Sequence, residues 1–352
     1  MAGVVVEEVD MRHARVKIEG TGCYHVVSRI VDRNFRLDDG EKEIFRRMMR
    51  KAEEFSGVRV LTYAVMSNHF HLLVEVPERG EVDEAELLRR VTALYGTPYA
   101  ADMARQWAEW RKTGADYLVG EQQDRLRLRM GDVSAFVKTL KQRYSMSYNS
   151  RYKRTGTLWE ERFKSVLVEN GECAKATVAA YIDLNPVRAK IVADPKDYRW
   201  SGYGEACGGS RIARAGLIAV HDSRHYEQTG AWRHVSTRYR VLLYTEGEER
   251  WAAYGGRVVR KGIESDEVDK VIENSGKLTI QAVLRCRVRY FTDGMAFGGK
   301  AFVDRVFNDN RRFFSPGRKD GARKMRFAEW GELRVARALR VAPVSTPLTM
   351  TT

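Results

Sequence analysis

Two adjacent strand-like segments, joined by only three residues, constrain the fold of this chain most strongly. Val58–Val65 and His69–Val76 are both rich in β-branched and aromatic residues, and a polar turn at 66–68 separates them. Pro77 ends the second segment. Because so short a connection joins antiparallel neighbours, the centre of the fold is predicted to be an antiparallel sheet.

Further strands and amphipathic helices flank this pair. Their predicted order along the chain is a strand at 22–29, a helix at 41–55 that ends at Gly57, the paired strands, a helix marked by apolar residues at 136–144, a strand at 164–169 and a helix at 172–184. The first six elements match the split βαβ, ferredoxin-like arrangement, and one helix is added. The predicted class is therefore α+β.

Three other parts of the chain differ in character from these elements. Residues 79–132 are polar and helical in pattern, and they are interpreted as a helical insertion in a domain that covers 1–205. Gly and Ser cluster at 208–210, so a boundary is predicted near 206. Residues 206–340 are expected to form a mainly helical accessory domain, and 341–352 a disordered tail.

The predicted accessory domain is basic. Helix-like runs lie at 264–274, 279–289 and 300–307, and the last two flank a turn at Asp293-Gly294. Residues 309–340 hold 10 basic and 4 acidic residues, a net charge of +6. A helix-turn-helix module that reads duplex DNA and a helical cap on the first domain both fit this pattern. We expect the region to supply DNA affinity and no chemistry.

The whole chain is basic, as the predicted accessory domain is. Lys and Arg total 61 against 47 acidic residues, which gives a net charge of +14 and a pI near 9.6. Such a surplus suits a polyanionic partner such as nucleic acid, although a basic protein without one has the same composition. The N-terminus has no signal-peptide pattern, no apolar run could span a membrane, and the four cysteines stand apart, so a cytoplasmic, nucleoid-associated protein is predicted.

Two pairs of polar residues are candidates for chemistry. His69 and His71 are two residues apart in a predicted strand, so both imidazoles project from one exposed face and could bind one metal ion. Tyr181 and Asn185 are four apart at the end of a predicted helix, so a phenol and an amide lie on one helix face. Taken alone, each pair also fits an ordinary structural role.

Taken together, four runs in this sequence resemble a known family. They are CYHVVSR, NHFHLLVEVP, GTLWEERFKSVLVE and AAYIDLNPVRAKIVADPKDYRWSGYGE. In this order they are similar to the single-tyrosine transposases of the HUH endonuclease superfamily, and within it to the REP-associated tyrosine transposases. The resemblance covers about residues 20–205. The insertion at 79–132 and the extension past 206 depart from the family pattern.

The resemblance implies a site and a reaction. It places paired metal-binding histidines on His69 and His71, a nucleophilic tyrosine on Tyr181, in the added helix, and a third metal ligand on Asn185. Oxygen-rich surroundings suit Mg²⁺ or Mn²⁺, and imidazole ligands alone would also accept Zn²⁺. The implied reaction cuts single-stranded or hairpin DNA through a 5′-phosphotyrosine and then joins a second end. The resemblance leaves both a monomer and a homodimer open.

A basic and aromatic stretch at 138–162 has the composition of a segment that binds single-stranded DNA. In it the predicted DNA contacts are Arg151, Lys153, Arg154, Trp159 and Arg162, whereas the apolar residues at 136–144 are predicted to lie in the core.

Three functions would account for some or all of these features. The first is a metal-dependent DNA endonuclease and strand-transferase. The second is a domesticated, catalytically silent DNA-binding regulator with the same fold, whose usual sign is loss of a histidine or of the tyrosine. The third, a metal hydrolase that uses only His69 and His71, leaves Tyr181 and the basic surface without a role.

Overall fold

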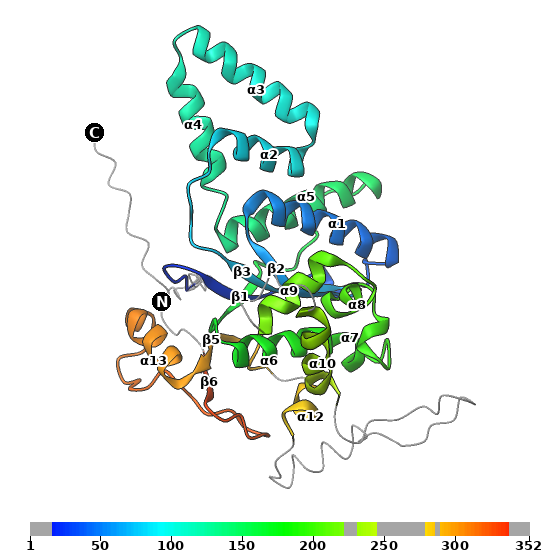
Figure 1. Ribbon diagram of the computed structural model, residues 1–352. Helices are drawn as coiled ribbons and strands as arrows, with labels where there is room; N and C mark the ends of the chain where they lie inside the picture. The colour runs from blue at the N-terminus through cyan, green and yellow to red at the C-terminus, as the bar shows by residue number, and fades with distance from the viewer. Residues whose placement is uncertain (1–15, 222–230, 245–278, 286–288, 338–352) are drawn as a thin grey trace, which may run out of the picture.

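The computed structural model describes residues 16–221, 231–244, 279–285 and 289–337. Its centre is a sheet of six described strands in the order β2-β3-β1-β4-β5-β6 (Figure 1). The strands are β1 (Gly22–Arg29), β2 (Arg59–Val65), β3 (His69–Val76), β4 (Lys164–Val168), β5 (Gly294–Gly299) and β6 (Leu333–Arg337). The first four are antiparallel neighbours in the predicted split βαβ order, so the α+β prediction is confirmed.

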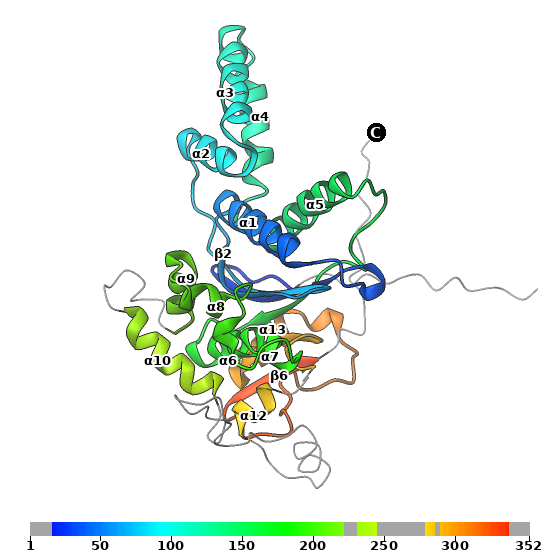
Figure 2. The same ribbon diagram turned by 90° about the vertical axis from the view of Figure 1, so that its right-hand side faces the viewer.

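Helices cover both faces of the sheet. On one face lie α1 (Asp39–Ser56) and α5 (Val133–Arg151), and on the other lie α6 (Glu172–Asp183), α8 (Gly202–Cys207) and α9 (Arg211–His221) (Figure 2). The remaining described helices are α2 (Glu84–Tyr95), α3 (Thr97–Lys112), α4 (Asp116–Arg127), α7 (Asn185–Arg188), α10 (Ala231–Leu243), α12 (Ile280–Leu284) and α13 (Lys300–Asp309). None of the helices in these described ranges is long and apolar enough to cross a membrane.

Alternation of side chains along β3 divides the core in two. Phe70, Leu72 and Val74 are fully buried beneath α1 and α5. The histidines and Leu73 project to the opposite face, against α6. The apolar residues of β3 therefore face one core and the histidines the other.

Helix α6 and its neighbours lie unusually close to the sheet. Every residue of α6 from Ala174 to Asp183 is buried. A Cβ atom added to Gly216 of α9 would lie 2.4 Å from the carbonyl oxygen of Leu61 in β2, so only glycine allows this approach of helix to strand. The face that carries the histidines is therefore closed by helices.

The C-terminal part of the chain extends the same sheet. Strand β5 pairs in parallel with β4, and β6 pairs antiparallel with β5. Of the two alternatives for the segment around Asp293-Gly294, the helix-turn-helix is ruled out, because β5 begins at Gly294 and separates α12 from α13. The boundary predicted near 206 falls inside α8, and the sheet runs through both predicted domains. The predicted helix at 264–274 and the predicted tail at 341–352 lie outside the described residues.

The polar segment predicted as an insertion forms the three helices α2, α3 and α4. They project away from the sheet as an arm (Figure 1). Their apolar residues make a separate core around Leu87, Trp107 and Leu126, and α1 contributes Phe55 to it. The arm is thus stabilised mainly by its own packing.

A buried carboxylate holds α6 in place. Asp183 accepts hydrogen bonds from the Thr62 hydroxyl at 2.9 Å, the Tyr203 backbone N–H at 3.0 Å and the Tyr239 hydroxyl at 2.6 Å. These donors belong to β2, α8 and α10. Burial raises the pKa of Asp183 to about 7, against the opposing effect of the three donors. Since α6 carries Tyr181, this network also fixes the position of the candidate nucleophile.

Tyr239→Phe should reveal the charge on Asp183. Because the folded protein binds the Asp183 proton more tightly than the unfolded chain, stability decreases as the pH rises from about 4 to about 7. Loss of the Tyr239 donor raises the pKa further, so the loss of stability in the variant should grow with pH. We expect about 1 kcal/mol near pH 5 and about 2–3 kcal/mol near pH 8, where the acceptor is charged.

Chemical denaturation at both pH values measures this difference. Tyr117→Phe is the matched control, because that side chain is 73% exposed. A loss at Tyr239 that is equal at both pH values would show that Asp183 does not change its charge in this range.

Candidate active site

The four predicted site residues come together at one end of β3. Rings of His69 and His71 have centroids 5.1 Å apart, and the Tyr181 ring lies 6.2 Å from that of His71. The amide nitrogen of Asn185 lies 3.5 Å from Nε2 of His69. Residues more than 100 positions apart in the sequence thus form one cluster.

The chain direction at the end of α6 brings Tyr181 and Asn185 to this cluster. Helix α6 ends at Asp183, and the short helix α7 starts at Asn185 with Pro186 in its first turn. Proline is favoured there because it needs no hydrogen-bond acceptor for its nitrogen. The predicted helix stop therefore sets the position of the amide relative to the phenol.

His71 is buried, which differs from the exposed position that the sequence predicted. Its side chain lies beneath α6, and the predicted exposure failed because the strand pattern does not show which helices cover a face. Burial, followed by the nearby imidazoles of His25 and His69, holds the pKa of His71 well below its usual value. The His71 imidazole is therefore neutral at physiological pH.

His25, which the sequence analysis missed, lies beside His71. Its Nε2 is 2.9 Å from Nδ1 of His71, and its Nδ1 is 2.6 Å from the carbonyl oxygen of Phe291. Burial lowers the pKa of His25 to about 4. His25 alternates with Cys23 and Val27 on one face of β1, but this spacing alone does not mark it as a site residue. Its position beside His71 follows only from the β1–β3 register.

His69 is held by the residue that precedes it. Nδ1 of His69 lies 2.6 Å from the side-chain oxygen of Asn68, and the amide nitrogen of Asn68 donates to the carbonyl oxygen of Arg33 at 2.9 Å. The second bond fixes which end of the Asn68 amide faces His69. The oxygen of Asn68 therefore accepts a hydrogen bond from the Nδ1–H of His69, and Nε2 keeps its lone pair.

Tyr181 lies under residues that the sequence analysis placed in an accessory domain. The Phe291 ring packs against the Tyr181 ring at 4.7 Å. The Arg188 guanidinium lies 4.0 Å from the centroid of the same ring and donates to the carbonyl oxygens of Tyr181 and Leu284. The Tyr181 hydroxyl makes no hydrogen bond with the described residues. The C-terminal region thus helps to build the site, and the expectation that it supplies DNA affinity and no chemistry stays a prediction.

Basic side chains flank the histidines on the same face of the sheet. Arg29 is the direct cross-strand partner of His69, and Lys164 is opposite Val27, which is itself opposite His71. Direct partners project to the same face. Lys164 is 60% exposed and 3.6 Å from Asp293, whereas Arg29 has no carboxylate partner among the described residues. Positive charge therefore lies at the edge of the cluster.

The residues present fit a divalent metal ion. In the described part of the chain, no three His, Cys, Asp or Glu side chains gather as a metal site, so His69 and His71 would need an amide as the third ligand. The amide nitrogen of Asn185 lies 3.5 Å from Nε2 of His69, so the amide would have to turn over to present its oxygen as a ligand.

Two of the predicted DNA contacts are structural. Trp159 is buried against Phe45 and Phe70, and its indole N–H donates to the carbonyl oxygen of Lys141. Arg151 makes a two-bond ion pair with the buried carboxylate of Glu41. A buried Trp159 cannot stack on a base, and the alternation of basic and aromatic residues does not reveal which of them face the core. Arg151 is exposed, and its contact with DNA stays a prediction.

The other predicted contacts differ in exposure. Lys153 and Arg162 are exposed, whereas Arg154 is half-buried, with its guanidinium 5.8 Å from the ring centroid of Tyr148. Their contact with DNA stays a prediction.

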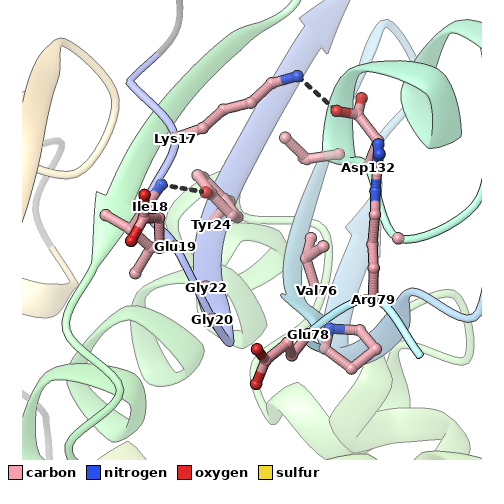
Figure 3. Close-up of a pocket in the computed structure, with 13 residues that line it drawn as sticks. Lys17, Ile18, Glu19, Gly20, Gly22, Tyr24, Val76, Glu78, Arg79 and Asp132 are labelled. Carbon is pink, nitrogen blue, oxygen red and sulfur yellow. Dashed lines mark hydrogen bonds and ion pairs between the residues drawn. The ribbon is translucent and has the colours of Figure 1, made fainter. Parts of the chain in front are cut away.

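A shallow pocket lies away from this cluster (Figure 3). Its volume is about 520 Å³, and it is lined by Gly22 and Val76, a pair at the end of the sheet opposite to His69. The ammonium group of Lys17 is paired with Asp132 at its rim. The pocket contains none of the candidate chemical groups.

Comparison with known proteins gives one family. Residues 21–95 match the family described as transposase, IS200-like. The match includes both histidines of β3 and confirms the predicted resemblance over this part of the chain. Tyr181 and Asn185 lie beyond the matched residues, so the family match does not bear on them.

Among solved structures, the chain is similar to one described as the REP-associated tyrosine transposase bound to a REP hairpin. The two chains are 16% identical, with a TM-score of 0.37, and the alignment covers 57% of this chain and 89% of the other. No curated protein matches the chain.

The buried position of Trp159 predicts a stability effect. Trp159→Ala should lower the free energy of unfolding by about 3–5 kcal/mol, because it leaves a cavity between α1, α5 and β3. Arg162→Ala, an exposed change three residues later, should alter it by less than about 0.5 kcal/mol. Denaturant unfolding measures both, and a Trp159 variant as stable as the Arg162 variant would contradict the core assignment.

Proposed function

We propose that this protein is a metal-dependent endonuclease and strand-transferase for single-stranded or hairpin DNA, and that Tyr181 forms a 5′-phosphotyrosine intermediate. One observation carries the proposal: Tyr181 from α6 and Asn185 from α7 lie beside the two histidines of β3. The IS200-like transposase match over residues 21–95 supports the reaction class.

The metal site would use His69, His71 and Asn185. Mg²⁺ and Mn²⁺ fit because an amide oxygen, phosphate oxygens and water could complete the coordination. When bound, such an ion withdraws charge from a phosphate and orients it for in-line attack. Neutral imidazoles are the form that binds metal, and burial keeps the pKa of His71 low enough for this form.

Tyr181 would carry the covalent step. Its phenolic oxygen forms a bond to phosphorus, the bond from phosphorus to the 3′ oxygen breaks, and the phenol loses a proton while the 3′ oxygen gains one. The products are a 5′-phosphotyrosine and a free 3′-hydroxyl. Reversal by a second 3′-hydroxyl joins another end without ATP, because the phosphodiester energy is kept in the covalent bond.

Neighbouring residues would hold the phenol and the DNA. Phe291 and Arg188 pack on the Tyr181 ring and limit its rotation. The guanidinium of Arg29 and the ammonium of Lys164 provide positive charge for backbone phosphates on the same face of the sheet. These contacts position DNA without reading its sequence.

Tyr181→Phe tests the nucleophile. The change removes one hydroxyl and keeps the ring packing, so the variant should fold and bind hairpin DNA as the wild type does. Cleavage should fall below detection, because no other group replaces the nucleophile in the covalent step. Wild-type protein should give a protease-sensitive adduct that carries only the DNA fragment downstream of the cut.

Labels at the 5′ end and, separately, at the 3′ end identify the fragment in the adduct. Tyr198→Phe is the matched control, since Tyr198 is buried outside the cluster and donates to the carbonyl oxygen of Val65. Cleavage by Tyr181→Phe would contradict the nucleophile. Binding of palindromic DNA without any cutting by wild type would instead support the catalytically silent DNA-binding regulator.

Metal removal tests the histidines. Cleavage should stop in EDTA and return with Mg²⁺ or Mn²⁺. His69→Ala should abolish it, and Asn185→Ala should reduce it less, because a neutral amide is a weaker ligand than an imidazole. Circular dichroism should show folded protein in both variants, and full activity in EDTA would rule out the metal.

A further inference from the structure

We infer that His25 is a positioning residue: it keeps the proton of His71 on Nδ1 and so leaves the Nε2 lone pair of His71 for a divalent metal ion. The inference rests on the metal site of the proposed function. It adds to that site a residue from β1 and a backbone carbonyl from the C-terminal region.

A carbonyl oxygen can only accept a hydrogen bond. Nδ1 of His25 lies 2.6 Å from the carbonyl oxygen of Phe291, so Nδ1 carries the His25 proton. In a neutral imidazole the other nitrogen is then an acceptor. Nε2 of His25 therefore accepts from Nδ1 of His71 at 2.9 Å, and His71 is protonated on Nδ1.

Burial of both histidines excludes water as a competing partner for these two hydrogen bonds. His25 is 1% exposed and His71 is 4% exposed, so water cannot readily take the place of either partner. The antiparallel register of β1 and β3 places Leu73 directly opposite His25, which sets His71 on the diagonal. A second arrangement of the two protons would leave the Phe291 oxygen facing a lone pair, at a cost of about 1–3 kcal/mol.

His69 provides an independent parallel. Asn68 accepts from Nδ1 of His69, and its own orientation is fixed by its bond to the Arg33 carbonyl. Both metal-binding histidines thus have Nδ1 engaged by an acceptor of the protein. Both present Nε2, and for His69 that atom faces Asn185. Two different acceptors therefore leave the same ring nitrogen, Nε2, with its lone pair in both histidines.

Phe291 joins this arrangement to the nucleophile. Its carbonyl oxygen orients His25, while its ring packs on Tyr181 at 4.7 Å. Movement of this one residue would disturb the metal ligand and the phenol together. Residues 289–293, which directly precede β5, consequently contribute to the position of both.

The tautomer can be read directly in the metal-free full-length protein. In ¹⁵N-histidine-labelled protein, the protonated and the bare ring nitrogens have well-separated chemical shifts, and His71→Gln assigns the signals of His71. We expect His71 with its proton on Nδ1. A proton on Nε2 of His71 would overturn the inference.

Substitution of His25 tests the consequence for metal. His25→Leu removes both hydrogen bonds and should weaken Mn²⁺ binding by about 10- to 100-fold in calorimetry of the full chain without DNA. His25→Gln keeps one donor and one acceptor and should remain within about 3-fold of wild type. Leu73→Val is the control, because it changes packing directly opposite His25 and leaves the bonds intact.

The outcomes separate this inference from the proposed function. Wild-type Mn²⁺ affinity in His25→Leu, or an equal loss in Leu73→Val, would overturn the positioning role, whatever the cleavage results. Loss of cleavage in Tyr181→Phe bears on the proposed function alone. If His25→Leu does not fold, the tautomer of His71 in the wild type and the Mn²⁺ affinity of His25→Gln still test the positioning role.

Discussion

The antiparallel register of β1 and β3 is the constraint on which the rest of the site depends. It places His25 diagonal to His71 and Arg29 opposite His69, so one pair of strands supplies the two candidate metal ligands, a hydrogen-bond partner for His71 and a positive charge. A shift of β3 by one residue would turn both of its histidines toward α1 and α5 and away from His25. The buried apolar residues on the other face of β3 prevent such a shift, because they would then leave their core.

Much of the fold could be predicted from the sequence, because periodicity and turn residues are local signals. Predicted bounds of β1 and β3 agree with the structure, and α1 ends at Gly57, whose φ of 70° suits glycine. The C-terminal strands could not be predicted in this way. Strand β5 is a short GMAFGG segment that pairs with β4 more than 120 residues earlier, and no local pattern indicates such a partner.

The site was predictable only in part, for a related reason. The residues at 69, 71, 181 and 185 stand in motifs, and the structure brings them together. The roles of His25 and Phe291 depend on contacts across strands and across 266 positions of sequence, which motifs do not record. For Trp159 the sequence pattern suggested a function that the structure does not support. Its basic neighbours suggest contact with DNA, yet its ring fills the space between α1 and β3.

The arm formed by α2, α3 and α4 has a consequence for how such chains can diversify. Its core is separate, and the chain leaves and rejoins the body at nearby points, because a Cβ atom added to Gly131 would lie 2.8 Å from the side chain of Arg79. The arm is therefore a structurally independent unit attached to the sheet at a single place. Another helical hairpin with the same spacing between its ends could replace it while the strands keep their pairing, so the arm can change much faster in evolution than the sheet that carries it.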